Sequence, residues 1–191
     1  MVKGVFLGSH PSLSDFHKQH PGKRGIQQFI LVGRSNVGKS SLINYLFGKI
    51  AKTAKKPGKT VMPQFFLTPL GIFIDLPGYG FARVSKTIQS TWNSSILSIL
   101  EKNVDLSCIL FLLDIRHNPS LEDLEMLAWI RKSGLPCFLL FTKSDKLRRQ
   151  EKEKRETALQ KELGIRGIAY SYREKSGAKE LLMRLQNGTF A

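Results

Sequence analysis

Cysteine and long apolar runs are both scarce in this sequence of 191 residues. The two cysteines, Cys108 and Cys137, each lie in a short apolar run, which predicts reduced core residues rather than a disulfide framework or a metal site. No apolar run approaches the roughly 20 residues needed to cross a bilayer. Residues 1–13 also lack the apolar stretch of a signal peptide. We therefore expect a cytoplasmic protein without stable membrane insertion.

Acidic side chains are scarce as well, because 15 Asp and Glu residues stand against 30 Lys and Arg residues and leave a formal net charge of +15. An excess of this size carries information about partners rather than about fold. It favours nucleic acid, a ribonucleoprotein or an anionic membrane face as the partner. The length suits one domain with a substantial core that needs neither disulfides nor a structural metal.

One stretch fits the phosphate-binding pattern Gly-x4-Gly-Lys-Ser/Thr. An apolar run at 29–32 suits a buried strand before it, and apolar residues at helical spacing follow at 42–47. Glycines let backbone amides turn toward phosphate oxygens, and the positive end of the following helix adds to the attraction. Lys39 would reach the terminal phosphates, and the Ser40 hydroxyl would bind magnesium. The predicted phosphate loop consists of Gly33, Arg34, Ser35, Asn36, Val37, Gly38, Lys39 and Ser40.

Strand patterns alternate with helix patterns along the rest of the chain. Two apolar runs around the break at 68–70 predict an antiparallel hairpin, and continuous apolar runs predict strands covered on both faces. This alternation is typical of an α/β doubly wound sheet, mostly parallel, here with six strands of which one hairpin strand is antiparallel. We expect strands at 27–32, 64–67, 71–75, 108–114, 136–141 and 167–170, and helices at 39–48, 87–103, 119–132, 147–163 and 177–186.

The first 24 residues differ from the rest because His10-Pro11, His20-Pro21-Gly22 and Lys23-Arg24 break any period. We expect an irregular leader at 1–24, packed partly through apolar side chains. Residues 25–191 then form the nucleotide-binding domain, and the whole chain makes a single domain.

The segment Asp75-Leu76-Pro77-Gly78 fits Asp-x-x-Gly at the end of a predicted strand. Asp75 could hold the magnesium shell while the Gly78 amide contacts a γ-phosphate. The plain alternative is an Asp before an ordinary Pro-Gly turn. A further candidate metal ligand is Thr60, which follows Gly58 and Lys59 at the end of the basic loop 49–60 and is placed to close over the γ-phosphate.

The segment Thr142-Lys143-Ser144-Asp145, at the end of another predicted strand, discriminates between bases. Guanine presents two donors that one carboxylate accepts, whereas adenine presents one donor beside an acceptor. Asp145 therefore selects guanine. Thr142 keeps a hydroxyl where GTPases usually have Asn, and the stem of Lys143 can lie along the base. The segment can also serve as a polar N-cap for the next helix.

Two segments compete for the loop that would meet guanine O6. Ser171-Tyr172-Arg173 lies directly after the last predicted strand, whereas 176–179 resembles the common Ser-Ala-Lys only superficially. Placement at a strand end makes us prefer Ser171 and Tyr172. Ser176 is then expected to be the N-cap of the last helix.

The position after Asp-x-x-Gly, where many GTPases keep a water-positioning Gln, is Tyr79. An aromatic ring cannot orient water in that way, so we expect slow intrinsic hydrolysis that a partner, an ion or a displaced side chain completes. Asn36 offers a neutral oxygen near the β/γ-phosphate bridge, where K⁺ could replace an arginine finger. The candidate catalytic residues are Lys39, Asn36 and Thr60. Arg34 and Arg83 are alternative charge donors or plain surface arginines.

Four motifs, at 33–44, 57–60, 75–82 and 142–147, together resemble the EngB family of bacterial GTPases, of the Era-like TRAFAC class. The similarity runs in order from about residue 6 to residue 186. Val61 stands where the family usually has Gln, and Tyr172 stands where Ser or Ala is usual. The resemblance implies a Ras-like P-loop GTPase fold that binds GTP or GDP with Mg²⁺.

The resemblance also implies action in assembly of the large ribosomal subunit and a role in cell division and septation. We expect a monomer whose loops 49–60 and 76–86 order around the γ-phosphate. Basic residues at 143–155 would contact rRNA phosphates in a subunit precursor or form a solvated helix face. The alternative function is a GTP-regulated binding protein at the membrane or division site with incidental hydrolysis. Asp145 disfavours an ATP-driven enzyme.

Overall fold

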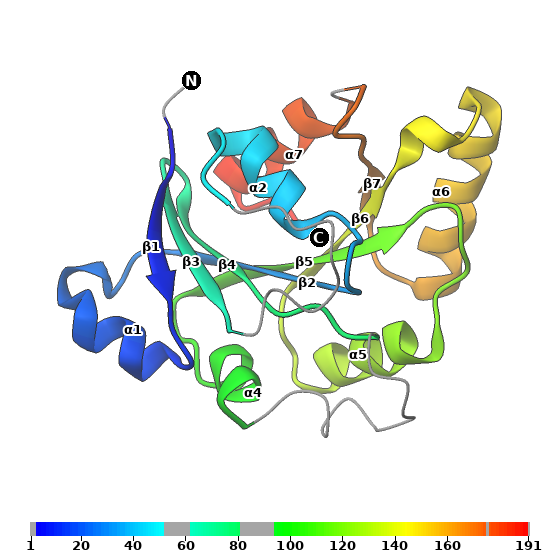
Figure 1. Cartoon of the computed structure of the whole chain (residues 1–191). Helices are drawn as coiled ribbons and strands as arrows, with labels where there is room; N and C mark the ends of the chain where they lie inside the picture. Colours follow the sequence, from blue (N-terminus) through cyan, green and yellow to red (C-terminus); the bar gives the residue numbers. More distant parts are fainter. Residues whose placement is uncertain (1–2, 52–61, 81–93, 175, 191) are drawn as a thin grey trace.

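A mixed β-sheet forms the centre of the molecule (Figure 1). The computed structural model describes residues 3–51, 62–80, 94–174 and 176–190, and of 94–96 only the backbone. Within these residues the sheet has seven strands in the order β1-β3-β4-β2-β5-β6-β7. They are β1 (Val5–Ser9), β2 (Gln28–Gly33), β3 (Gln64–Thr68), β4 (Gly71–Asp75), β5 (Leu106–Asp114), β6 (Cys137–Thr142) and β7 (Gly167–Ala169).

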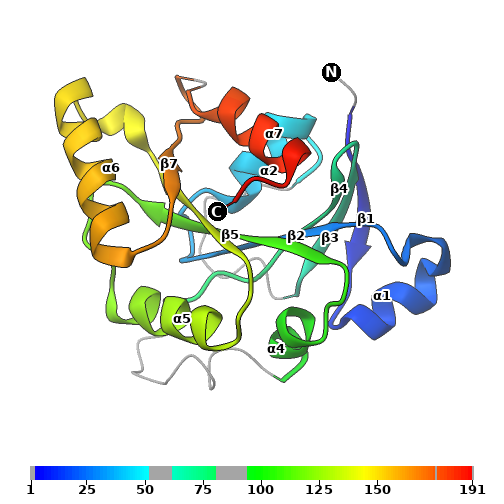
Figure 2. The same cartoon turned by 180° about the vertical axis from the view of Figure 1, so that it is seen from behind.

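Helices cover both faces of this sheet, as Figure 1 and the reverse view of Figure 2 show. They are α1 (Leu13–Gln19), α2 (Lys39–Phe47), α4 (Ser94–Glu101), α5 (Leu121–Lys132), α6 (Arg149–Leu163) and α7 (Ala178–Asn187), with 3-10 turns at Pro21–Lys23 and Ser144–Lys146. None of the helices in the described ranges has the length and apolar content required to cross a membrane.

The two faces of β2 enter two separate cores, because successive side chains of a strand point to opposite sides. Phe29 and Leu31 pack with α2 and α7, while Ile30 and Val32 pack with α1, α4, α5 and α6. All four side chains are fully buried. This explains why the strand appears in the sequence as a continuous apolar run. Both cysteines are free, as predicted, and burial raises the pKa of the Cys108 thiol.

The expected α/β doubly wound architecture is confirmed, with β3 antiparallel to both of its neighbours and the remaining described pairs parallel. The expected number of six strands is wrong, because β1 adds a seventh beside β3. The expected helix at 87–103 is present as α4 from Ser94, and its first part lies outside the described residues.

The expectation of an irregular leader at 1–24 is also wrong. Residues Val5–Ser9 form β1, which pairs antiparallel with β3 and covers an edge that would otherwise expose unpaired backbone groups. Helix α1 follows, and the Ser12 side chain caps it by accepting a hydrogen bond from the Asp15 amide at 3.1 Å. Phe16 is fully buried and stacks on Phe65 with 4.3 Å between ring centroids.

The parallel strands bring the predicted motifs to one edge of the sheet. Leu31 of β2 is in register with Asp75 of β4, and Asp114 of β5 is in register with Thr142 of β6. The phosphate loop follows β2 at the same edge. Ligands of open α/β sheets bind at this carboxyl edge.

Candidate functional site

The phosphate loop joins β2 to α2 through backbone conformations that glycine favours. Gly33 has φ of 152°, and a Cβ atom there would lie 2.6 Å from the Leu112 carbonyl oxygen, so no side chain fits. Gly38 has φ of 120° and is the N-cap of α2. Asn36 adopts the left-handed region with φ of 60° and is exposed. The predicted strand–loop–helix arrangement is therefore confirmed.

Lys39 is held inside this loop. It is only 8% exposed, and its Nζ donates to the carbonyl oxygens of Gly33 at 3.0 Å and Arg34 at 3.2 Å. Burial lowers the pKa of the Lys39 ammonium, and the negative charge of Asp75 partly opposes that shift. A desolvated ammonium at this place gains most from an anion that arrives beside it.

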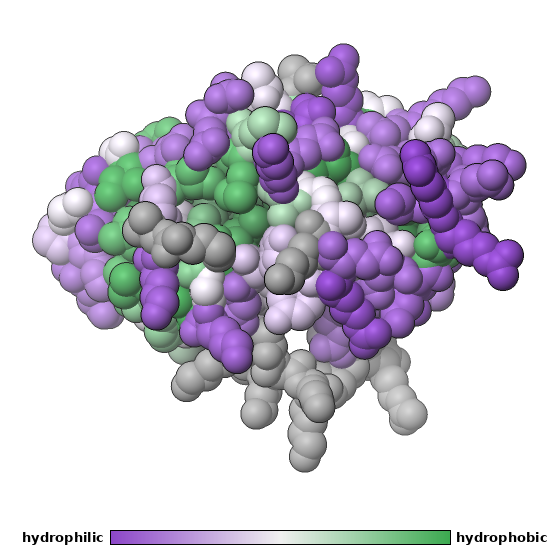
Figure 3. Space-filling model, turned by 90° about the horizontal axis from the view of Figure 1, so that it is seen from above, coloured by the Kyte–Doolittle hydropathy of each residue, from purple (hydrophilic) through white to green (hydrophobic). Residues whose placement is uncertain are grey.

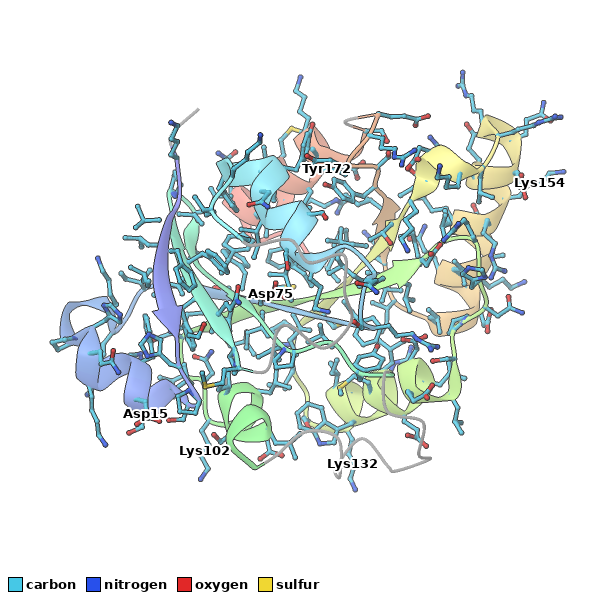
Figure 4. The ribbon with its side chains drawn as sticks, in the orientation of Figure 1. Asp15, Asp75, Lys102, Lys132, Lys154 and Tyr172 are labelled. Atoms are coloured by element: carbon cyan, nitrogen blue, oxygen red, sulfur yellow. The ribbon has the colours of Figure 1, made fainter. Side chains whose placement is uncertain are left out.

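Asp75, at the end of β4, lies in the centre of the molecule (Figure 4) and is 1% exposed. Its Oδ2 accepts a hydrogen bond of 2.6 Å from the Ser40 hydroxyl, while its Oδ1 is buried with no hydrogen-bond partner among the described residues. Burial raises the pKa of the Asp75 carboxyl, against the opposing effects of Lys39 and Ser40. This carboxylate therefore has an unmet need for a cation or a donor.

The carboxylate and the hydroxyl fit magnesium, which takes oxygen ligands and is usually bound through one or two protein oxygens plus phosphates. Across the described ranges, no cluster of three or more His, Cys, Asp or Glu side chains could hold a metal by itself. A divalent ion beside Asp75 would therefore depend on oxygens from a bound phosphate chain. The other predicted ligand, Thr60, lies outside the described residues together with Gly58 and Lys59.

The Asp-x-x-Gly loop lies directly against the phosphate loop. A Cβ atom on Gly78 would be 2.6 Å from the Ser35 amide nitrogen and 2.9 Å from Lys39 Nζ, so only glycine allows this approach. The Ser35 amide donates to the Tyr79 carbonyl oxygen at 3.0 Å. Backbone amides of Gly78 and of the phosphate loop are thereby brought to the same place.

The Tyr79 ring points away from this place into the core. It is 1% exposed, and its hydroxyl donates to Asp123 Oδ1 of α5 at 2.7 Å. Burial, together with the adjacent Asp123 charge, raises the pKa of Tyr79 well above its usual value. Our sequence analysis did not identify Asp123. The available signal was Ser120 three residues earlier, since this pair forms the capping box that begins α5.

The residues predicted to bind guanine lie close together at the ends of β6 and β7. The Ser171 hydroxyl is fully buried and donates to Asp145 Oδ1 at 2.8 Å, and Lys146 Nζ lies 3.8 Å from Asp145 Oδ2. The Thr142 hydroxyl donates to the Leu113 carbonyl oxygen at 3.1 Å and so ties β6 to β5. Of the two segments considered for the guanine loop, the one with Ser171 supplies the serine that contacts Asp145.

Two expected N-caps are wrong. Gly177 rather than Ser176 is the N-cap of α7, and the Ser176 hydroxyl is buried with no hydrogen-bond partner in the described structure. The Lys143–Asp145 segment does not cap α6, which begins after Arg148. Instead Ser144–Lys146 forms a 3-10 turn that brings Asp145 back toward Ser171.

Lys143 and Asp114 form an ion pair that our sequence analysis missed. Lys143 has φ of 60°, and its Nζ lies 3.0 Å from Asp114 Oδ2. Burial tends to raise the pKa of Asp114, but hydrogen bonds from Arg116 and Lys143 outweigh it and hold the pKa well below its usual value. The available signal was the position of Asp114 at the end of a predicted strand. The pair fixes the Lys143 side chain at the rim of the site.

A cleft of about 290 Å³ lies beside the phosphate loop. Its walls are residues 34–37, the end of β5 with Asp114, residues 117–119, Asp123 of α5, and Lys143 after β6. At the other side of the site, Tyr172 is 51% exposed (Figure 4), and its ring lies 6.0 Å from the Tyr45 ring of α2. The Arg34 guanidinium lies close to Gly80, whereas Arg83 is outside the described residues.

Comparison with known proteins gives a consistent result. A family model described as 50S ribosome-binding GTPase matches residues 28–143. The probable GTP-binding protein EngB of Clostridioides difficile (strain 630) is 36% identical over 186 residues, which cover 94% of this chain and 92% of that protein. The protein of the same name from Streptococcus uberis (strain ATCC BAA-854 / 0140J) is 40% identical over 171 residues, covering 86% of each.

A solved structure supports the fold. The crystal structure of a probable GTP-binding protein engB matches with a TM-score of 0.68 and covers 84% of this chain and 97% of that chain. Its sequence identity is 24%, so the likeness concerns the fold alone.

Proposed function

The chain belongs to the EngB family of GTPases, and from that premise we propose that it is a magnesium-dependent guanine-nucleotide switch in assembly of the large ribosomal subunit. The observation that carries the proposal is the buried group of Lys39, Ser40 and Asp75 beneath the phosphate loop, in which one Asp75 oxygen has no described partner. Such a group is completed by a phosphate chain with its metal. Normal cell division and septation would depend on the same activity.

The phosphate end of the site would work as follows. Amides of the loop 33–38 and the N-terminus of α2 would bind the β-phosphate, and Lys39 would bridge the β- and γ-phosphates. Ser40 and Asp75 would hold magnesium, with Thr60 as a further ligand. When bound, magnesium neutralises charge on the β- and γ-oxygens. Gly78 would offer its amide to the γ-phosphate from its position against Ser35.

The guanine end would read the base. Asp145 has one oxygen engaged with Ser171, and a carboxylate has about four lone-pair sites, so it can still accept the two guanine donors. The Lys143 stem would lie along the base, and Thr142 would support the loop. The backbone after β7, at Ser171 and Tyr172, would meet guanine O6. GTP would order the loops 49–60 and 76–86 around its γ-phosphate, and hydrolysis to GDP would release them.

Hydrolysis would be slow without a partner. The ring of Tyr79 is committed to the core, so it is not available to orient water. Asn36, exposed in the phosphate loop, would place a K⁺ ion near the β/γ bridge and supply positive charge there. A ribosomal partner could complete the same site.

The partner surface would be the basic segment 143–155, which contains seven basic and three acidic residues. Figure 3 shows hydrophilic side chains projecting at the end of the molecule where α6 lies, and Lys154 points outward from α6 in Figure 4. A shallow groove of about 490 Å³ runs along this helix and is lined by Arg148, Gln150, Glu151, Lys154, Arg155 and Ala158. Basic side chains along a groove suit the phosphates of rRNA.

The proposal is tested by co-sedimentation of the monomeric protein with purified large-subunit precursors in GTP, GDP or no nucleotide. We expect binding that depends on GTP and weakens steeply as salt rises. The Arg148→Ala/Lys154→Ala double variant should weaken binding and flatten the salt slope by about 1 for each phosphate that is no longer neutralised. Lys18→Ala/Lys102→Ala, which removes two positive charges at exposed positions in α1 and just after α4, is the matched control.

Binding that ignores salt would contradict the RNA contact, and binding that ignores the nucleotide would contradict the switch. Sedimentation with anionic vesicles in place of subunits would favour the membrane alternative. GTP hydrolysis measured on the same preparations reports separately on the enzyme.

A further inference from the structure

A buried hydrogen bond connects the Asp-x-x-Gly loop to the opposite layer of the molecule. The Tyr79 hydroxyl donates to Asp123 Oδ1 at 2.7 Å, and both side chains are at most 3% exposed. The two residues are 44 positions apart in the sequence. A hydrogen bond from a neutral hydroxyl to a buried carboxylate is of the stronger, charge-assisted kind.

Asp123 is itself rigidly placed. Its Oδ2 accepts hydrogen bonds from the Ser120 amide at 2.8 Å and the Ser120 hydroxyl at 2.9 Å, and its own amide donates back to that hydroxyl at 3.3 Å. This capping box fixes Asp123 in the first turn of α5. Asp123 therefore offers Tyr79 an acceptor that does not move independently of the helix.

The backbone of Tyr79 is held on the other side by the phosphate loop. Its carbonyl oxygen accepts from the Ser35 amide at 3.0 Å, and Arg34 and Tyr79 form an isolated parallel bridge. Gly78, one residue earlier, is so close to Ser35 and Lys39 that a Cβ atom would not fit. The Gly78 amide thus lies one residue from a side chain that α5 fixes.

We propose that the Tyr79–Asp123 hydrogen bond is a latch that positions Gly78 for the γ-phosphate, so that Tyr79 and Asp123 are positioning residues for the recognition of GTP over GDP. The inference rests on the proposed function, since it assigns the γ-phosphate to the Gly78 amide. GDP has no γ-phosphate, so its binding does not depend on the latch.

A packing role alone does not account for the hydroxyl. The Tyr79 ring packs in the core with its centroid 6.4 Å from that of Phe111, and a phenylalanine would fill the same space. Burying a hydroxyl is unfavourable unless it is hydrogen-bonded, and the bond then returns only a modest net gain in stability. What the hydroxyl adds is direction, because it fixes the rotation of the ring and hence the course of residues 78–80.

The test compares the affinities of Tyr79→Phe for GDP and for a non-hydrolysable GTP analogue with a β,γ-imido bridge, measured with fluorescent nucleotides. We expect the affinity for the analogue to fall about tenfold, as loss of a charge-assisted hydrogen bond can cause, and the affinity for GDP to change less than about twofold. Asp123→Asn keeps the cap through its oxygen, and its amide can donate to the Tyr79 hydroxyl. It should therefore stay near wild type.

Ser120→Ala is the matched control, because it removes a capping bond of α5 but leaves the Tyr79–Asp123 bond. It should lower the thermal midpoint and leave the ratio of the two affinities unchanged. If Tyr79→Phe does not fold, Asp123→Ala is compared with Ser120→Ala, since both weaken the cap and only the former removes the latch.

The latch would be overturned if Tyr79→Phe left the ratio of the affinities for the GTP analogue and GDP unchanged, or if both affinities fell equally. A wild-type protein that binds neither guanine nucleotide, or binds both without magnesium dependence, would instead overturn the proposed function. The two failures are therefore distinguishable in one set of titrations.

Discussion

The two ends of the candidate nucleotide site differ in how far the protein pairs its own carboxylates. At the phosphate end, Asp75 Oδ1 is buried with no partner among the described residues, and Lys39 is a desolvated ammonium. At the guanine end, Asp145 bonds Ser171, and Lys143 pairs with Asp114. The carboxylate of the first end needs a ligand to be complete. Those of the second end already have partners, although the Ser144 hydroxyl there is buried with no hydrogen-bond partner among the described residues.

This difference indicates a division of labour. Unsatisfied buried groups are unfavourable in the free protein, and a ligand that satisfies them gains the corresponding free energy. The phosphate end should therefore supply most of the affinity. Preordered groups at the guanine end change little on binding, so they discriminate between bases because a wrong base leaves polar groups unpaired. The predictions below test this division.

The largest effect should come from Lys39→Ala. The change removes the charge that bridges the loop carbonyls and the expected phosphates, so we predict a loss of nucleotide affinity of at least about 100-fold. Titration with fluorescent GTP and GDP measures it. Lys102→Ala, at an exposed position just after α4, should bind like wild type. A loss of nucleotide affinity smaller than about tenfold in Lys39→Ala would contradict the claim that the phosphate end supplies most of the affinity.

Asp75→Asn should abolish the influence of magnesium. In the wild type, a chelator should accelerate nucleotide release, because Asp75 and Ser40 would hold the metal beside the phosphates. In the variant, release should be equally fast with and without the chelator, and GTP hydrolysis should fall by about 100-fold. Stopped-flow release and phosphate production measure the two quantities. A variant that keeps its response to the chelator would show that Asp75 does not hold the metal.

Asp145→Asn should change the preference for guanine over adenine and leave the binding of the phosphates intact. One carboxylate oxygen is replaced by an amide donor that faces the guanine donors, so guanine affinity should fall about 30-fold while adenine affinity stays weak. Ser171→Ala removes the hydrogen bond to Asp145 and the oxygen that accepts from the Arg173 and Glu174 amides, and its guanine affinity should fall about fivefold. Competition titrations with GTP and ATP provide the comparison. Unaltered guanine preference in Asp145→Asn would refute the base assignment.

The smallest effect concerns how the ion pairs of Asp114 make the free energy of unfolding depend on pH. The folded-state pKa of Asp114 is lowered, so its ion pairs add stability above the unfolded value of about 4, and this stability is lost as pH falls toward the folded pKa. Asp114→Asn should be less stable at neutral pH by at most about 1 kcal/mol, because the pairs are partly exposed. The difference in stability between the two proteins should shrink as pH falls below about 4. Chemical denaturation at pH 7 and pH 3 measures this.

The sequence predicts those parts of the fold that follow from local pattern. The run 28–33 and the glycines after it specify β2 and the phosphate loop, and Gly164, in the left-handed conformation, ends α6 as its C-cap. The burial of β2 on both faces also follows from its unbroken apolar composition.

The missed features depend on contacts between distant residues. Strand β1 exists because β3 offers an edge, and its exposed Val5 and Phe6 give no apolar alternation to detect. The Tyr79–Asp123 bond joins residues 44 apart, and each has a local explanation, a turn or a cap, that conceals the pairing. The Lys143–Asp114 pair requires knowledge that β5 and β6 are neighbours in register.

The central claim is that the buried phosphate end is completed by a guanine nucleotide with magnesium. Its most direct test is calorimetric titration of the wild-type protein with GTP, GDP and ATP, with magnesium and with a chelator. The account predicts that GTP and GDP bind, that magnesium tightens their binding, and that ATP binds at least about 100-fold more weakly. Equal binding of ATP and GTP, or binding indifferent to magnesium, would contradict it.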